Sequence, residues 1–220
     1  MKLDVAREAQ RRGLPATPVL EPTEVLENEH ITARGTFRSL PVGGGQQAKV
    51  PVGFVFVDGV RAEVASGPPE VGEHTEEVRS SSAPAIPKTA NAPGRPLEGL
   101  RVLDFGIGAV GVELGRLLAE YGADVLKVES SDFPDFIRTI MGTMMNPSFA
   151  SSSRSKRGLG VDLKKARGLE IVEKLVRQAD VFIENNAAGV MDRLGLGRER
   201  LRELNPKLGA FSSNMTGSQG

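Results

Sequence analysis

The stretch over residues 99–129, GLRVLDFGIGAVGVELGRLLAEYGADVLKVE, constrains the fold more than any other part of the chain. A short apolar run over 101–105 is followed by apolar residues at helical spacing over 112–121 and by a second apolar run over 123–128. Between the first run and the helix, three glycines have the spacing G-x-G-x-x-G: Gly106, Gly108 and Gly111. This order predicts a strand, a glycine turn, a helix and a second strand, which is half of a doubly wound α/β nucleotide-binding unit.

Strand and helix patterns continue to alternate beyond this unit. The predicted helices cover 136–145, 166–178, 190–194 and 199–204, and the predicted strands cover 158–163, 181–184 and 208–214. Alternation of this kind favours parallel strands with helices on the sheet faces. We therefore expect a Rossmann-like α/β fold with a mainly parallel, incomplete doubly wound sheet.

Residues 1–78 differ from the rest in their weak apolar periodicity. We expect a short polar helix over 4–12, one or two helical turns over 22–28, a glycine loop over 43–45 and a weak strand pair over 50–60. A segment with so little apolar surface can hardly bury enough to fold alone, so it is predicted to be an extended N-terminal arm. Residues 79–96 are rich in proline, serine and alanine and are predicted to be a linker to the Rossmann-like part over 97–220.

The composition excludes several classes of function. Lys plus Arg and Asp plus Glu both number 28, so no net field attracts nucleic acid or an anionic membrane. The chain has no cysteine and only two histidines, His30 and His74, which makes a metal site improbable and is compatible with a cytoplasmic location. No apolar run has the length of a membrane span. We expect no metal and neither nucleic acid nor membrane as a partner.

The glycine spacing supports two interpretations. G-x-G-x-x-G after a strand, with Glu129 closing the next strand 18 residues beyond Gly111, is the pattern of a dinucleotide site in which the carboxylate binds ribose. An NAD(P)-dependent oxidoreductase or nucleotide-binding module would use it in this way. Alternatively, the glycines only permit a tight turn and close packing of helix on strand.

Two further groups of residues are candidates for ligand binding. One is a basic cluster suited either to phosphates or to solvent: Arg154, Lys156, Arg157, Lys164 and Lys165. The other is the loop over 184–189, at the edge where open α/β sheets bind ligands, although Asn185 there is equally suited to cap the next helix. Asp104 and Asp162 lie in or beside strands, where aspartate more often serves structure, and no G-x-S-x-G motif occurs.

Several phrases over residues 96–220 resemble the opening portion of the family III CoA-transferases, which includes formyl-CoA:oxalate and carnitine CoA-transferases and the α-methylacyl-CoA racemases. They occur in the family's order at 96–104 (PLEGLRVLD), 121–129 (YGADVLKVE), 155–157 (SKR), 161–164 (VDLK), 180–185 (DVFIEN), 192–195 (DRLG) and 204–208 (LNPKL). Three phrases of the first segment resemble the closing residues of the same family: RGLPATPVL, EVLENEHITARGTF and GEHTEEV. The resulting order of tail, linker and head implies the junction of a tandem fusion of two transferase copies or, alternatively, a permuted or truncated gene product.

The resemblance implies a CoA-transferase, or a piece of one, in acyl-CoA metabolism, with coenzyme A or acyl-CoA as substrate and a carboxylate as the second substrate. It implies a CoA site made of Gly108, Ala109, Val110, Val161, Lys164, Asn185, Asn186, Arg193 and Leu194. The family's catalytic aspartate, and the His/Asp pair of the racemases, lie beyond the glycine-rich turn that residues 217–220 resemble, so no catalytic residue is assigned and the chain alone is expected to be inactive. A homodimer, or the remainder of a longer transferase, is the partner that this resemblance implies.

Overall fold

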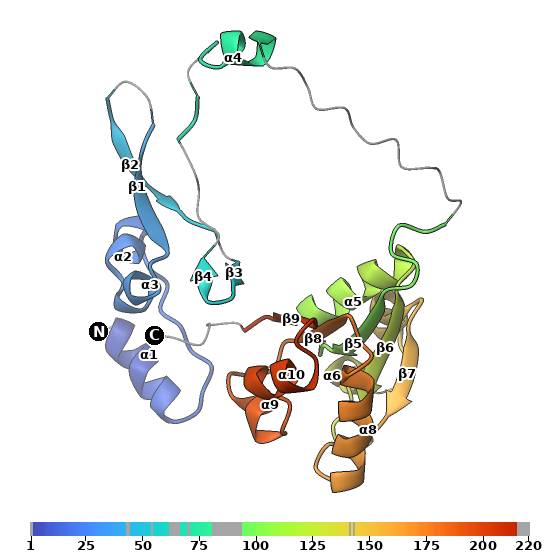
Figure 1. The fold of residues 1–220 in the computed structure, drawn as a ribbon. Helices are drawn as coiled ribbons and strands as arrows, with labels where there is room; N and C mark the ends of the chain where they lie inside the picture. Colours follow the sequence, from blue (N-terminus) through green and yellow to red (C-terminus); the bar gives the residue numbers. More distant parts are fainter. Residues whose placement is uncertain are drawn as a thin grey trace. The chain divides into compact units, whose positions relative to one another are not determined.

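The computed structural model divides the chain into two compact units, Met1–Lys88 and Thr89–Ser218, which are described separately (Figure 1). The structure describes residues 2–42, 45–53, 55–61, 67–69, 71–80, 94–140, 142 and 144–214. Most of the predicted linker (81–93), two glycines of the predicted 43–45 loop and the glycine-rich turn at 217–220 lie outside these residues. In the described part of the chain, no helix is long and apolar enough to cross a membrane.

The first unit consists of short helices and two antiparallel hairpins. Its elements are α1 (Lys2–Arg11), α2 (Pro22–Glu27), α3 (Glu29–Ala33), β1 (Phe37–Pro41), β2 (Gln47–Pro51), β3 (Phe56–Val57), β4 (Val60–Arg61) and α4 (Thr75–Ser80). The predicted helices correspond to α1 and α2, and the predicted strand pair is reduced to β3 and β4, whereas the β1–β2 hairpin was not predicted. Ala6 and Leu40 are the buried apolar side chains in the described part of this unit, which therefore has little core of its own.

The second unit contains a five-stranded parallel sheet in the spatial order β7-β6-β5-β8-β9. Its elements are β5 (Arg101–Phe105), α5 (Val110–Glu120), β6 (Asp124–Glu129), α6 (Phe136–Ile140), α7 (Pro147–Ser153), β7 (Arg157–Gly160), α8 (Ala166–Val176), β8 (Val181–Glu184), α9 (Val190–Arg193), α10 (Arg198–Leu204) and β9 (Gly209–Ser212). The predicted α/β class and Rossmann-like order are confirmed, and every strand pair in this sheet is parallel.

Two elements between β6 and β7 differ from the prediction. The predicted helix over 136–145 ends at Ile140, and α7 forms in a serine-rich stretch for which no helix was predicted. Asn146 caps α7 by accepting a hydrogen bond from the Phe149 N–H at 3.0 Å, and Pro147 occupies its first turn. The single large apolar side chain of this serine-rich stretch, Phe149, is buried, which anchors the helix to the unit.

Side chains of β5 alternate between the two faces of the sheet. Leu103 and Phe105 belong to the core beneath α8 and α10, where the Phe105 ring stacks on Phe182 with centroids 4.8 Å apart. Val102 belongs to the core beneath α5, and Asp104 follows on the same face. From β5 the chain adds β6 and β7 on one side, and β8 and β9 then lie on the other side, so the strand order reverses between the neighbouring strands β5 and β8. Phe105 pairs with Glu184 where these two strands end. Open α/β sheets bind ligands at such a switch point.

Candidate functional site

Asn185 connects the two loops that meet at the switch point. Its Oδ1 accepts a hydrogen bond from the Ile107 N–H at 2.6 Å, and its Nδ2 donates to the Ile107 carbonyl at 2.8 Å. The alternative role of Asn185 as a helix cap is wrong, because α9 is capped by Gly189 with no side-chain hydrogen bond. Asn185 instead holds the β5–α5 turn, which comprises residues 106–109, against the end of β8.

Two glycines of the fingerprint allow close packing of α5 on β5. A Cβ atom on Gly106 would lie 2.5 Å from the carbonyl carbon of Gly111 and from the nitrogen of Val112. A Cβ atom on Gly111 would lie 2.8 Å from Asn185 Oδ1. Both distances are too short for a side chain, so these glycines serve the packing role that was the alternative to dinucleotide binding.

Gly108, the middle glycine, is contacted by residues that precede or begin α6. Its φ of +77° is in the left-handed region, which explains the glycine. Its N–H donates to Asp135 Oδ1 at 3.0 Å, and a Cβ atom on Gly108 would lie 2.5 Å from Phe136 Cζ. The middle of the turn is therefore covered by the protein's own side chains.

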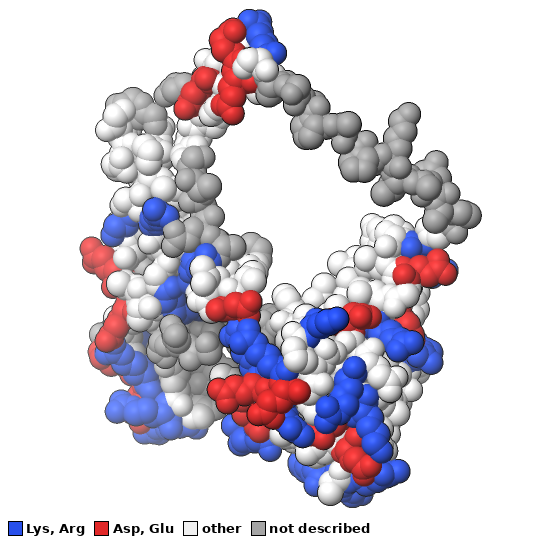
Figure 2. Space-filling view, in the orientation of Figure 1, with Lys and Arg blue, Asp and Glu red and all other residues white. Residues whose placement is uncertain are grey.

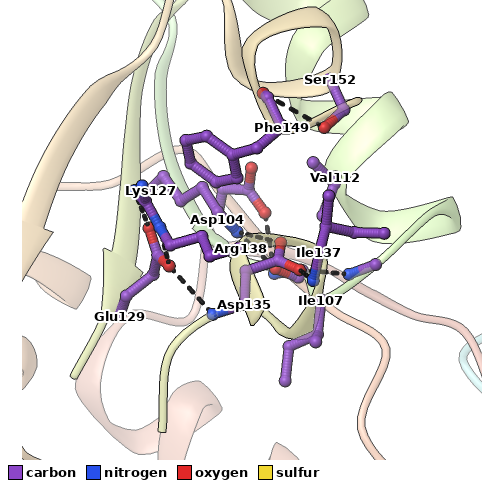
Figure 3. A network of polar contacts seen from close by, with 12 residues as sticks. Asp104, Ile107, Val112, Lys127, Glu129, Asp135, Ile137, Arg138, Phe149 and Ser152 are labelled. Atoms are coloured by element: carbon purple, nitrogen blue, oxygen red, sulfur yellow. Dashed lines mark hydrogen bonds and ion pairs between the residues drawn. The ribbon is translucent and has the colours of Figure 1, made fainter. Parts of the chain in front are cut away.

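Three ion pairs surround the turn, and Figure 3 labels both partners in two of them, Lys127–Asp135 and Glu129–Arg138. They join Asp104 to Lys156 at 2.7 Å, Lys127 to Asp135 at 3.1 Å and Glu129 to Arg138 at 2.8 Å. The first two pairs are buried, with every side chain at most 3% exposed. Lys127 Nζ also donates to the Gly106 carbonyl at 2.6 Å, so a strand lysine fixes the first residue of the turn. Burial lowers the pKa of the Lys156 ammonium, although the Asp104 carboxylate opposes this shift.

The predicted basic cluster is divided among separate carboxylates. Lys156 is buried with Asp104, while the other pairs join Arg154 to Glu120, Arg157 to Asp124 and Lys165 to Asp162. On the face shown in Figure 2, Lys and Arg side chains lie among those of Asp and Glu. The structure does not gather the five residues into one cluster, because four of the cations pair with four different carboxylates.

Apart from Asn185, the predicted CoA-site residues fall into three groups. Ala109 and Val110 are exposed where α5 begins, next to Gly108. Val161, Asn186 and Leu194 are half-buried. Val161 and Leu194 pack against the core beneath α8, whereas the Asn186 N–H donates to Glu184 Oε2 at 2.8 Å. Lys164 and Arg193 are exposed, and no ion pair joins either of them to another described residue. Within the described residues, Asn185 is the one predicted site residue from outside the turn that hydrogen bonds to it.

Glu129, the predicted ribose carboxylate, is held by α6. Arg138 donates to both of its oxygens, from Nε at 2.9 Å and from Nη2 at 2.8 Å, and the Asp135 N–H donates to Oε2 at 2.9 Å. Burial raises the pKa of Glu129, but these hydrogen bonds outweigh it and the net shift is downward. The Arg138 guanidinium also lies 3.5 Å from the centre of the Phe149 ring, which fixes it in place.

We expect Glu129→Gln to lower the free energy of unfolding by about 2 kcal/mol at neutral pH, because it removes charge-assisted hydrogen bonds. Since folding lowers the pKa of Glu129, its stabilisation is present above the ordinary value of 4.5 and is lost as the pH falls through the lowered pKa. Urea unfolding across the acid range should thus show a shallower pH dependence for the variant. The exposed Glu98→Gln is the matched control, and an equal loss from both variants would contradict the prediction.

Sequence reasoning missed three residues that contact the turn, Lys127, Asp135 and Phe136, and it missed Arg138, which binds Glu129. One signal was present, because Lys127 interrupts the apolar run of a strand predicted to be buried on both faces. A lysine in such a position requires a counter-charge. The partner, Asp135, lies in a loop whose path the sequence pattern does not define.

The family model of CoA-transferase family III matches residues 2–75 and 97–220 as two segments. The chain is 36% identical over 218 residues to the probable CoA-transferase Rv1866 of Mycobacterium tuberculosis, an alignment that covers 99% of this chain and 28% of that protein. It is 36% identical over 116 residues to formyl-CoA:oxalate CoA-transferase of Escherichia coli O81, covering 51% of this chain and 28% of that protein. The chain thus spans less than a third of the length of these curated relatives.

Two solved structures share this fold over part of the chain. The hypothetical protein Rv3272 from Mycobacterium tuberculosis aligns with a TM-score of 0.54 at 34% identity, over 59% of this chain and 36% of that one. A CAIB/BAIF family protein from Brucella suis aligns with a TM-score of 0.51 at 36% identity, over 54% of this chain and 33% of that one.

Proposed function

Because the chain belongs to CoA-transferase family III, we propose that its second unit is the CoA-binding part of an enzyme that transfers CoA between an acyl-CoA and a carboxylate. The names of the relatives support this class of reaction, since one group is named for the transfer of CoA from formyl-CoA to oxalate. We also propose the predicted order of tail-like arm, linker and head-like part, which is supported by the two family segments and the alignment to Rv1866 along nearly the whole chain. Sequencing across both ends of the gene would test that order.

The observation that carries the CoA proposal is the character of the carboxyl edge at the switch point. Asn185 fixes the β5–α5 turn, and beside it Ala109 and Val110 present small, exposed apolar side chains. Such a surface suits the pantetheine arm of CoA, which is linear and uncharged. Lys164 and Arg193 follow β7 and β8 at the same edge and keep their charges available for the phosphates of CoA.

We expect the chain to bind CoA more tightly than NAD, because CoA carries a 3′-phosphate that NAD lacks and that an unpaired cation can bind. Calorimetric titration with CoA, dephospho-CoA and NAD should give the affinity order CoA, dephospho-CoA, NAD. Lys164→Ala and Arg193→Ala should each weaken CoA binding about 10-fold, which is the value of one charge-assisted hydrogen bond.

Arg157→Ala is the matched control, because this arginine is exposed like the other two but is paired with Asp124 at 2.6 Å. It should leave CoA affinity unchanged. NAD binding tighter than CoA binding would contradict the proposal and favour the dinucleotide interpretation. Equal losses from all three variants would show that the cations act only through the general charge of the surface.

A further inference from the structure

Residues 135–138 occupy three places that a dinucleotide needs in a G-x-G-x-x-G turn. We propose that this 135–138 segment is a built-in specificity element that closes the turn to the pyrophosphate and ribose of NAD(P). This inference rests on the proposed function only for the identity of the ligand, CoA. It deepens that function because it states that the site excludes NAD(P) and names the residues that exclude it.

The first place is the anion position at the backbone amides. In glycine turns that bind anions, successive backbone N–H groups of the turn point at the anion. Here Asp135 Oδ1 accepts from the Gly108 N–H and the Ile137 N–H, both at 3.0 Å. Its Oδ2 lies 3.1 Å from Lys127 Nζ and accepts no hydrogen bond from any described residue, so that contact is an ion pair. A carboxylate that is 1% exposed therefore takes the place of an external anion.

The second amide of the turn is also occupied. The Ile107 N–H donates to Asn185 Oδ1 at 2.6 Å, so neither Ile107 nor Gly108 has an amide left for a ligand. A phosphate could bind there only by displacing two side chains whose polar atoms would then need new partners. Such a displacement is unfavourable, because a buried polar group without a hydrogen-bond partner costs its full desolvation penalty.

The second place that the 135–138 segment occupies is the approach path of the pyrophosphate. The second glycine of a dinucleotide fingerprint allows the pyrophosphate to approach the backbone closely. In this chain the Phe136 ring lies over that glycine, since a Cβ atom on Gly108 would lie 2.5 Å from Phe136 Cζ. The ring occupies the space into which the pyrophosphate would have to enter.

The third place is the predicted ribose carboxylate, Glu129, whose oxygens the same segment occupies. Arg138 binds both oxygens of Glu129, and its guanidinium is held between that carboxylate and the Phe149 ring (Figure 3). The segment therefore blocks three features of the fingerprint. Asp135 occupies the Gly108 amide, Phe136 fills the approach path, and Arg138 binds the acidic residue Glu129. What remains accessible at the turn is the start of α5, where Ala109 and Val110 are exposed.

The wild-type chain offers a direct test through the backbone amide of Gly108. We expect this amide to exchange slowly with solvent and to keep its NMR chemical shift when NAD or inorganic phosphate is added in millimolar amounts. A shift of the Gly108 or Ile107 amide that saturates with NAD would overturn the proposal. Failure of CoA to bind would count against the proposed function and would leave this result unchanged.

Asp135→Ala provides the second test, because it should create an empty anion site. We expect formate or phosphate to raise the Tm of the variant by about 4 °C relative to chloride at equal ionic strength, and to leave the wild type unchanged. Asp132→Ala, which removes an exposed carboxylate three residues away, is the matched control. Absence of any anion-specific stabilisation in a folded Asp135→Ala would overturn the proposal. If that variant does not fold in any of these salts, the amide titration of the wild-type chain decides.

Discussion

Asp104→Ala is expected to lower the free energy of unfolding by about 4 kcal/mol, because it leaves the Lys156 ammonium buried without a counter-charge. The two groups are 2.7 Å apart and at most 1% exposed. The substitution also removes the acceptor of the Gly106 N–H, which donates to Asp104 Oδ1 at 2.8 Å. A loss of this size is a large part of the stability of an ordinary domain.

Urea unfolding at neutral pH measures the effect, and Asp124→Ala is the matched control. Asp124 pairs with Arg157 at 2.6 Å, but both side chains are about half exposed or more, so its loss should cost at most about 1 kcal/mol. Similar losses from both variants would contradict the buried position of the Asp104–Lys156 pair.

The pH dependence gives an independent check of the same pair. Burial holds the pKa of Lys156 below its ordinary value of 10.5, so the unfolded chain binds more protons between the lowered pKa and 10.5. Stability therefore rises with pH through that window. Asp104 raises the pKa of Lys156, so removal of its charge should lower that pKa further. The free energy of unfolding of Asp104→Ala should therefore begin to rise at a lower pH than that of the wild type.

The fold of the second unit could be predicted because its signals are local. Apolar runs of strand length, a helix of period 3.6 and glycines at the turns each depend on neighbouring residues, and they predicted the alternation from β5 to β9. The arm was harder, since β1 exposes most of its side chains and lacks a clear two-residue period. Its antiparallel pairing with β2 could not be read from apolar alternation.

The candidate site was less predictable because its contacts are long-range. Asn185 was correctly singled out as a residue at the carboxyl edge, but its partner Ile107 is 78 positions away and is contacted through the backbone. Asp104 was assigned a structural role, yet its counter-charge, Lys156, was placed in a surface cluster. Charge alone does not show whether a lysine points outward or beneath a helix, since that depends on how closely the helix approaches the strand.

Gly115→Ala is expected to destabilise the chain by about 3 kcal/mol, although replacing glycine by alanine inside a helix ordinarily stabilises it by about 1 kcal/mol. Gly115 is buried on α5, and a Cβ atom there would lie 2.9 Å from Asp104 Cγ and 3.2 Å from Lys156 Nζ. The methyl group would press on the buried ion pair. Gly158→Ala on β7 is the control, because a Cβ atom at Gly158 meets nothing within 4 Å.

A double-mutant cycle shows whether Gly115 acts through the ion pair. With Asp104→Ala already in place, the carboxylate that a Cβ on Gly115 would touch is absent, so adding Gly115→Ala should cost much less than it does in the wild type. We expect the combined loss to be smaller than the sum of the single losses by about 2 kcal/mol. Additive losses would mean that the methyl group strains α5 elsewhere. A coupling of the expected sign would mean that Gly115 allows α5 to pack closely enough on β5 to bury the Asp104–Lys156 pair beneath the β5–α5 turn.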